Sequence, residues 1–140
     1  MSYSLSFSKS VLVVIFIADK VRQGTFEFLS TKMIAEVLDI PKPTLVKILL
    51  SLSTAGIIET REGKQGGVRL AKKPSQITVL DIFKALEEGK PLFYTDFDIL
   101  AKGKRPDNAK KNIKTILLNA ETQMRNALRM KTIEEILDEM

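Results

Sequence analysis

Three polar side chains in the first half of the chain have a spacing that suits contact with nucleic acid. Thr44, Lys47 and Ser51 recur at intervals of three and four residues, which places them on one face of a predicted helix. Hydroxyl and ammonium groups on an exposed helix face can bind base edges in the major groove of DNA. Any three-helix core with a solvated polar face would show the same pattern, so these residues alone leave both interpretations open.

A glycine-rich segment follows, GIIETREGKQGGVRLAKK at residues 56–73, and it holds four of the seven glycines of the chain. A phosphate-binding loop needs a strand before it and a helix after it, so that the helix N-terminus faces the anion. Here the runs Ile57–Arg61 and Val68–Lys72 are both β-prone, and no Gly-Lys-Ser or Gly-Lys-Thr triplet occurs. The segment therefore predicts a two-stranded hairpin joined by residues 62–67. Its surface carries the basic side chains Arg61, Lys64, Arg69, Lys72 and Lys73.

Residue types needed for catalysis are largely missing. The chain has no cysteine and no histidine, which excludes thiolate metal sites, cysteine nucleophiles and imidazole acid–base catalysis. A metal site built from carboxylates alone would have to use Asp96 and Asp98, the close acidic pair in a predicted loop. We therefore expect no enzymatic activity, no metal site and no cofactor.

Charge is spread unevenly along the 140 residues. The net charge is +5, and the first 80 residues hold 11 basic against 6 acidic side chains. A basic half suits a polyanionic partner, although many soluble proteins have this balance. The one long apolar run, Val11–Ala18, is shorter than the roughly twenty residues that span a bilayer, and no cleavage pattern follows it. We expect a cytoplasmic protein with no membrane partner, built as one compact unit or as a small domain with a helical arm.

Three predicted helices position the polar residues. The first covers Leu5–Arg22, the second runs from a Ser30 cap to Leu38, and the third begins at Pro41 and Pro43 and ends before Gly56. Inward-facing apolar positions are Met33, Ile34, Val37 and Leu38 in the second helix and Leu45, Ile48, Leu49 and Leu52 in the third. Two helices joined by a tight turn and followed by a basic hairpin are typical of a winged helix-turn-helix.

A fourth helix over residues 78–88 completes this predicted DNA-binding domain, which comprises residues 1–88. Residues 89–108 contain two prolines and no clear period, so we expect a loop or an effector region there. Phe93, Tyr94 and Phe97 lie close together in it. They could line an apolar pocket for a small-molecule effector, or simply pack the loop onto the fourth helix.

Residues 109–140 are expected to form a dimerisation helix and a short acidic C-terminal helix. The long helix should open at Asp107 or Asn108 and end near Met130. Its apolar seam has heptad-like spacing and consists of Ile113, Ile116, Leu117, Ala120, Met124, Ala127 and Leu128. The seam is expected to be buried in a homodimer, the alternative being that it packs on the first helix of its own chain. Thr132 and Glu135 then form a capping box for the last helix.

The run LSTKMIAEVLDIPKPTLVKILLSLSTAGIIETREGKQGGVRLAKKPSQITVLDI resembles the Rrf2 family of bacterial winged-helix regulators. The most specific part is Ala55–Ile82, and the order of the later helices fits the family to the end of the chain. The resemblance implies a fold that is mainly α with a small β-hairpin wing and a long dimerisation helix. It also implies a homodimeric transcription factor that binds double-stranded DNA, whose long helix crosses to the partner subunit.

Under this resemblance the DNA-binding residues fall into three groups. The donors for the major groove are Lys42, Thr44, Lys47 and Ser51, and the wing contacts are Arg61, Lys64, Gln65 and Arg69. Ser30, Thr31 and Lys32 open the second helix, whose free N–H groups and dipole suit a phosphate.

The chain departs from the family pattern in ways that bear on function. Family members that sense iron or redox state carry three cysteines in the loop after the fourth helix, whereas residues 90–108 have none, so no iron–sulfur cluster is expected. An arginine usually precedes the first glycine of the wing, whereas Glu62 stands there in this chain. We expect a sequence-specific repressor or regulator; the alternatives are a small-molecule sensor and a protein-interaction module with weak DNA binding.

Overall fold

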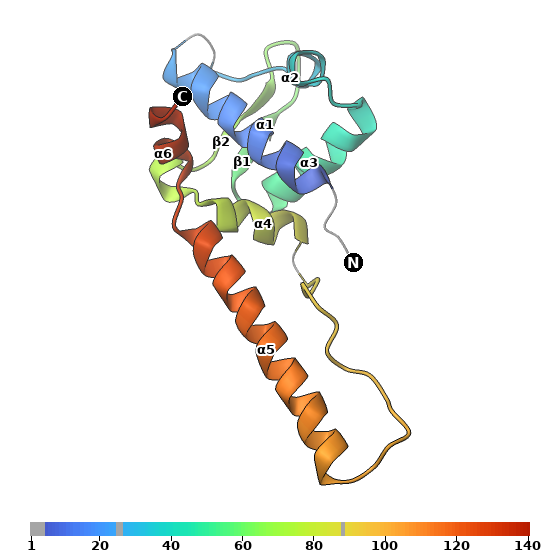
Figure 1. The fold of residues 1–140 in the computed structure, drawn as a ribbon. Coiled ribbons are helices and arrows are strands. Elements are labelled where there is room, and N and C mark those ends of the chain that lie inside the picture. Colours follow the sequence, from blue (N-terminus) through green and yellow to red (C-terminus); the bar gives the residue numbers. More distant parts are fainter. Residues whose placement is uncertain (1–4, 25–26, 88) are drawn as a thin grey trace.

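The computed structural model describes residues 5–24, 27–87 and 89–140. Within these ranges six α-helices, one short 3-10 helix and a two-stranded antiparallel hairpin follow one another. All elements except α5 form a globular head, and α5 projects from it as an arm (Figure 1). The predicted fold, mainly α with a small β-hairpin wing and a long helix, is confirmed.

The first helix, α1 (Leu5–Arg22), has the predicted bounds and lies at the centre of the head. It buries Val13, Val14, Ile17 and Ala18, and it packs against α4, α6 and β2. Because three elements from distant parts of the sequence meet on this one helix, α1 holds the head together.

The next two helices are α2 (Thr31–Leu38) and α3 (Lys42–Thr54). Ser30 caps α2 as predicted, because its hydroxyl oxygen accepts a hydrogen bond from the Met33 N–H at 3.1 Å. The apolar stripe predicted for α3 is buried. The predicted inward position of Val37 is wrong: it is 61% exposed, because α2 lies at the edge of the head and only Ile34 among its residues is fully buried.

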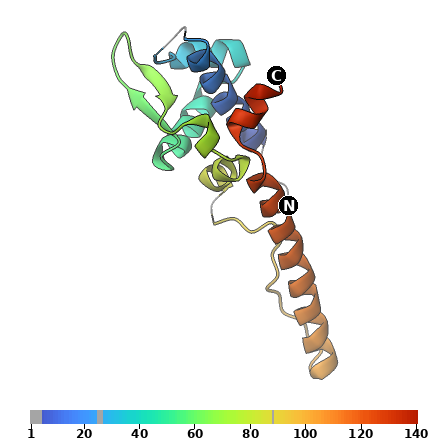
Figure 2. The same ribbon diagram turned by 90° about the vertical axis from the view of Figure 1, so that its left-hand side faces the viewer.

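The predicted hairpin consists of β1 (Ile58–Arg61) and β2 (Gly67–Leu70), with Ile58 opposite Leu70 and Arg61 opposite Gly67. A third backbone segment lies beside β2, where Leu29 and Val68 exchange two N–H···O=C hydrogen bonds of 2.9 and 2.8 Å. Since Leu29 directly precedes the cap of α2, this bridge ties the hairpin to the start of that helix. Figure 2 shows the hairpin projecting from the head, at the opposite end of the molecule from the free end of α5.

A 3-10 helix (Pro74–Gln76) leads into α4 (Val79–Glu87). Thr78 caps α4 in a reciprocal arrangement, because its hydroxyl accepts from the Asp81 N–H at 3.1 Å and the Asp81 carboxylate accepts from the Thr78 N–H at 2.9 Å. Phe83 on α4 meets Phe7 edge to face, with 5.3 Å between ring centroids. These contacts fix α4 against α1.

The long helix, α5 (Lys104–Arg129), begins three residues before the predicted Asp107. Its start was placed too late because Pro106 was taken as a break, whereas proline is tolerated in the first turn of a helix. None of its 26 residues is buried within the chain.

The acidic helix α6 (Ile133–Asp138) returns to the head and opens with the predicted capping box of Thr132 and Glu135. It buries Ile133 and Leu137, and Asp138 accepts a 2.7 Å hydrogen bond from Arg22 at the end of α1. The head is therefore closed by the last helix of the chain, far in sequence from α1. No helix among the described residues is long and apolar enough to cross a membrane.

Candidate nucleic-acid interface

The outward face of α3 lies opposite its buried stripe. At about 100° per residue this face centres on Pro43, Lys47 and Thr54, all of which are exposed. Thr44 and Ser51, predicted to share the polar face with Lys47, lie on its flank and are half-buried. Lys42, at the start of the helix, is exposed.

Two large apolar side chains on this face were missed by sequence reasoning. Val46 is 56% exposed and Leu50 is 67% exposed. They are four residues apart, so they lie side by side next to Lys47. The spacing rule could have found them, because neither belongs to the Leu45–Leu52 stripe; they were overlooked because apolar residues on a short helix are usually assigned to the core.

The N-terminus of α2 provides main-chain donors. The Ser30 hydroxyl is occupied by its cap bond to the Met33 N–H. Thr31 and Lys32 are exposed in the first turn, where helix N–H groups have no partner within the helix and the dipole is positive. This end of α2 suits an anion.

Wing-tip residues 61–65 are all exposed. Neither Lys64 nor Glu62 makes an ion pair with any residue that the structure describes. The tip therefore carries one uncommitted cation and one uncommitted anion two residues apart, and Gln65 follows them.

A surface hollow of about 440 Å³ joins these parts. Ser30 and Thr31 line it from α2, Leu49 from α3, and the segments 60–64 and 66–68 from the hairpin. The hollow thus brings the predicted α2 and wing groups together, whereas none of the predicted α3 donors lines it: Lys42, Thr44, Lys47 and Ser51 lie outside. Lys64 and the positive N-terminal end of α2 make one side of this hollow positive.

Arg69 has a different position from the one expected of a DNA contact. Its guanidinium is bound by Glu59 and, at 3.1 Å, by Glu27, and it stacks 4.5 Å from the Phe28 ring centroid. Arg61 lies over the same ring at 5.4 Å. These contacts commit Arg69 to neighbouring side chains at the surface, where it braces β2 against the chain before α2.

The adjacent glycines Gly66 and Gly67 are required by the backbone packing of the hairpin. Gly67 has φ = 142°, and a Cβ there would overlap the Leu29 carbonyl oxygen. A Cβ on Gly66 would overlap the Arg61 carbonyl oxygen in the same way. Both glycines therefore allow close backbone approach within the wing, which agrees with a hairpin and not with a phosphate cradle.

The three loop aromatics are exposed at the surface: Phe93, Tyr94 and Phe97 are 39%, 72% and 42% exposed. Phe97 borders a hollow beside Lys110, whose ammonium lies 5.4 Å from the ring centroid. The loop is attached to α5 by a 2.6 Å hydrogen bond from the Leu92 N–H to Glu121.

The apolar seam of α5 faces away from the head over most of its length. Ile113 and Ile116 are 41% and 65% exposed, and Ala120 and Ala127 are exposed as well. Leu117, Met124 and Leu128 are half-buried. Only the C-terminal part of α5 reaches α4, where Arg125 lies 5.4 Å from the Phe83 ring centroid. The predicted alternative, packing on the first helix, is wrong, since α1 is covered by α4, α6 and β2 instead.

Comparison with known proteins identifies the relatives of this chain. The model of the Rrf2 family, described as "Iron-dependent Transcriptional regulator", matches residues 3–139. The HTH-type transcriptional regulator NsrR of Bacillus licheniformis is 34% identical over 79 residues, which are 56% of this chain and 53% of that protein. The chain spans about half the length of the curated relatives it matches.

Two solved structures share the fold. T. potens IscR has a TM-score of 0.73 at 24% identity, over 99% of this chain and 88% of that one. CymR, the global cysteine regulator of B. subtilis, has a TM-score of 0.69 at 20% identity, over 100% of this chain and 98% of that one. Their similarity covers the arm as well as the head.

The residues of this chain do not fit the iron chemistry in the family description. Thiolate and imidazole ligands are missing from the whole sequence, and iron–sulfur clusters are held by such ligands. Among the described residues no group of three or more acidic side chains could hold a metal ion instead. An iron–sulfur cluster therefore has no ligand set in this sequence.

Proposed function

Because the chain belongs to the Rrf2 family of transcriptional regulators, we propose that it binds specific double-stranded DNA as a homodimer and represses transcription from its target promoters. The supporting observations are the hollow that joins the α2 N-terminus to the wing tip and the exposed outward face of α3. A recognition helix, a phosphate-binding helix end and a wing are the parts by which a winged helix holds a duplex. Such a regulator acts in the cytoplasm, where it binds the promoter DNA of its target genes.

In this proposal α3 enters the major groove. Lys47, Lys42 and Thr44 donate hydrogen bonds to base edges or to the flanking phosphates, and Ser51 adds a contact at the side of the helix. Pro41 and Pro43 set the angle at which the first turn is presented, since their rings fix the backbone there. Val46 and Leu50 touch the C5-methyl groups of thymine, the one apolar feature in the major groove.

Flanking contacts hold the duplex in register. The free N–H groups of Thr31 and Lys32 bind one phosphate, while Lys64 and Gln65 reach the backbone beside the minor groove. Arg61, at the edge of the wing, can also bind a phosphate, although its guanidinium lies over the Phe28 ring. Glu62 repels phosphates, so the tip approaches DNA with its Lys64 side.

Dimerisation supplies the second recognition helix. Burial of the α5 seam against its copy removes exposed apolar surface from water, which favours association. The division of labour is then a DNA-binding unit in residues 1–88, with pairing in residues 109–140. Two recognition helices related by a two-fold axis read half-sites about one helical turn apart, roughly 34 Å, or a small multiple of this.

Selection from a random duplex library tests the proposal. The protein is incubated with the library, bound duplexes are amplified through several rounds, and the enriched sequences are read. We expect an inverted repeat whose half-site centres are about 10 bp apart or a small multiple of that, and the Lys47→Ala variant should change the half-site. A library without enrichment would contradict sequence-specific binding and would favour the protein-interaction role, for which the exposed Glu62 is the supporting observation.

A further inference from the structure

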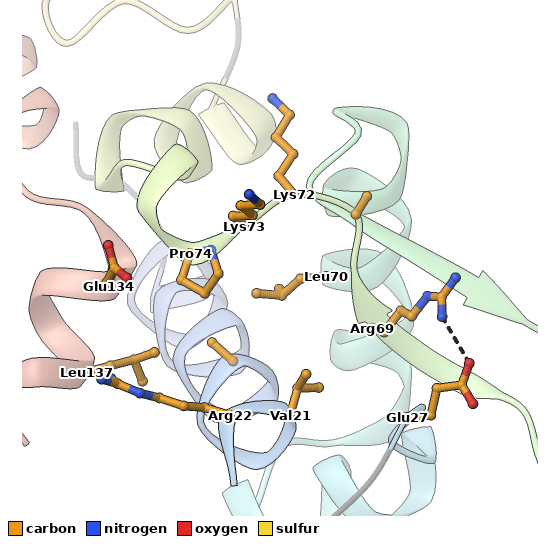
Figure 3. A pocket seen from close by; sticks show the side chains of 12 residues that line it. Val21, Arg22, Glu27, Arg69, Leu70, Lys72, Lys73, Pro74, Glu134 and Leu137 are labelled. Carbon is orange, nitrogen blue, oxygen red and sulfur yellow. Dashed lines mark hydrogen bonds and ion pairs between the residues drawn. The ribbon is translucent and has the colours of Figure 1, made fainter. Parts of the chain in front are cut away.

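We propose that a groove between the wing and α6 binds a small organic monoanion with an apolar body, and that this ligand lowers the affinity for DNA. This proposal rests on the proposed function, because the ligand would be the signal that regulates DNA binding. The groove has a volume of about 580 Å³, within the range of small-molecule sites in proteins. Its walls are the C-terminal part of α1, the strand β2 with the residues after it, and α6 (Figure 3).

The floor of the groove is apolar. Ala18 and Val21 come from α1, Leu70 and Pro74 from the end of the wing, and Leu137 from α6. Figure 3 shows Leu70, Pro74 and Leu137 around one open space. An alkyl chain or an aromatic ring placed there would remove its own surface and that of the floor from water.

The rim of the groove is mainly basic. Arg22, Arg69, Lys72 and Lys73 border it against Glu27 and Glu134. The Asp138 carboxylate accepts a 2.7 Å hydrogen bond from Arg22, and this bond raises the pKa of the guanidinium above its usual value. Arg69 is bound by Glu27 and Glu59. The two lysines make no ion pair with any described residue, so the uncommitted charge at this rim favours an anion.

Lys73 is the better placed of the two lysines. In Figure 3 it lies next to Pro74 at the apolar floor, whereas Lys72 extends away from Leu70, and Lys72 also lines a neighbouring hollow with Leu50. An anionic head group bound by Lys73 leaves the apolar body over Leu70 and Leu137. Glu27 and Glu134 repel a second negative charge, which favours a monocarboxylate over a phosphate.

A ligand in the groove would touch the attachment of the wing. Arg69 lines the groove, and its ion pair with Glu27 and its stacking on Phe28 hold β2 to the chain just before the Leu29–Val68 bridge. With the head group at Lys73, the apolar body over Leu70 lies beside Arg69, displaces its side chain from Glu27 and loosens this attachment. The α2 N-terminus and the wing then lose their fixed relation, and DNA affinity falls.

Calorimetric titration of the full chain with octanoate tests the site. We expect one octanoate bound per chain, at least tenfold weaker binding of 1-octanol, and no binding of octylamine. Lys73→Glu should abolish octanoate binding because it reverses the charge of the head-group partner. Val21→Trp should do so by filling the groove from its exposed rim; Val21 is 39% exposed, so the fold tolerates the larger ring.

Matched controls lie elsewhere on the surface. Lys102→Glu reverses an exposed charge in the loop before α5, and Leu12→Trp enlarges an exposed position of α1 outside the groove; both should bind octanoate as the wild type does. Thermal melts confirm that each variant is folded. Equal binding by Val21→Trp and the wild type, equal binding of octanoate and octanol, or no octanoate binding at all would overturn the site.

The proposed effect of the ligand on DNA affinity is tested by a separate measurement, DNA binding with and without octanoate. Octanoate at saturation should weaken binding of the selected duplex by roughly tenfold, and DNA should weaken octanoate binding by the same factor, because coupling between two sites is reciprocal. If octanoate binds and DNA affinity is unchanged, the site stands and its regulatory role is overturned. If no duplex is bound with or without octanoate, the proposed function fails, while calorimetry still decides the site.

Discussion

Lys47 lies beside two large apolar side chains, Val46 and Leu50, on the outward face of α3, so a charge and an apolar patch are presented together. Val46 and Leu50 are 56% and 67% exposed, although aliphatic residues of their size are usually buried. On a helix that reads DNA, such a pair is suited to thymine methyl groups. The selectivity of this protein should therefore depend on methyl contacts as much as on hydrogen bonds.

Replacing thymine by deoxyuridine in the selected half-site tests these contacts, since uracil differs from thymine only by the missing C5-methyl. We expect about a fourfold loss of affinity for each contacted methyl, from about 0.8 kcal/mol for one buried carbon. Leu50→Ala should bind more weakly and lose this sensitivity, measured by fluorescence anisotropy. Leu100→Ala, which changes a 98% exposed loop residue, serves as the control. Equal sensitivity to uracil in Leu50→Ala and wild type would contradict the contact.

Two glycines at the loop end of the wing give a prediction about stability. Gly67→Ala forces a Cβ onto the Leu29 carbonyl at a φ that alanine rarely adopts, so we expect a loss of at least about 3 kcal/mol in the free energy of unfolding. Gly63 also has positive φ but lies in open space, and Gly63→Ala should cost about 1–2 kcal/mol. Urea unfolding measures both. The reverse order of the two losses would show that Leu29 does not press on the wing.

Among the described elements, α5 leaves most of its apolar surface uncovered. Its 26 residues make a rod about 39 Å long, and its apolar seam is exposed or half-buried along its whole length. A helix of this length with one apolar face is rarely stable alone, because helices in proteins are held mainly by packing of that face. A second copy of the chain is the partner that the symmetry of a DNA half-site pair requires.

Ile116→Arg tests the dimer at the middle of the seam. Placing a charge in the predicted interface should weaken association by roughly 3 kcal/mol or more, so sedimentation velocity should show a particle of 15.7 kDa instead of twice that mass. Thr115→Arg introduces the same side chain on the opposite face of the helix and should leave the dimer intact. A monomeric wild type at micromolar concentration would contradict the assignment of α5.

Elements with a clear local pattern could be predicted from the sequence. The bounds of α1, the Ser30 cap, the buried stripe of α3 and the hairpin follow from periodicity, capping chemistry and glycine placement. The Leu29–Val68 bridge and the commitment of Arg69 to Glu27 could not, because both join segments about 40 residues apart. The hollow that joins the start of α2 to the wing and the groove beside α6 depend on those long-range contacts, so the sequence alone could not reveal them.

The whole molecule is a globular head with a protruding arm, and the last helix of the chain packs back onto the head. Because α6 packs on α1, Leu137 of α6 and Leu70 at the end of β2 border a common groove. In the proposed regulation, a ligand in the groove of mixed apolar and basic character beside α6 lowers the affinity for DNA.

DNA binding by this protein should not depend on iron. Treatment with EDTA, or anaerobic incubation with ferrous iron and sulfide, should leave the DNA affinity unchanged within twofold, because the chain has no cysteine or histidine to hold a cluster. Metal analysis after gel filtration should find less than one iron per chain. Stoichiometric iron that survives gel filtration and changes the affinity would contradict this expectation.

Sequence-specific DNA binding is the central claim, and fluorescence anisotropy with DNA from upstream of the protein's own gene tests it most directly. The duplex and a scrambled version are titrated at about 50 and 200 mM salt, with wild type, Lys47→Ala and Lys64→Ala. We predict at least about 10³-fold tighter binding of the native duplex, a steep loss with salt, and a salt slope that falls by about 0.9 for each phosphate contact removed. Equal, weak binding of both duplexes, unaffected by either lysine, would contradict the account.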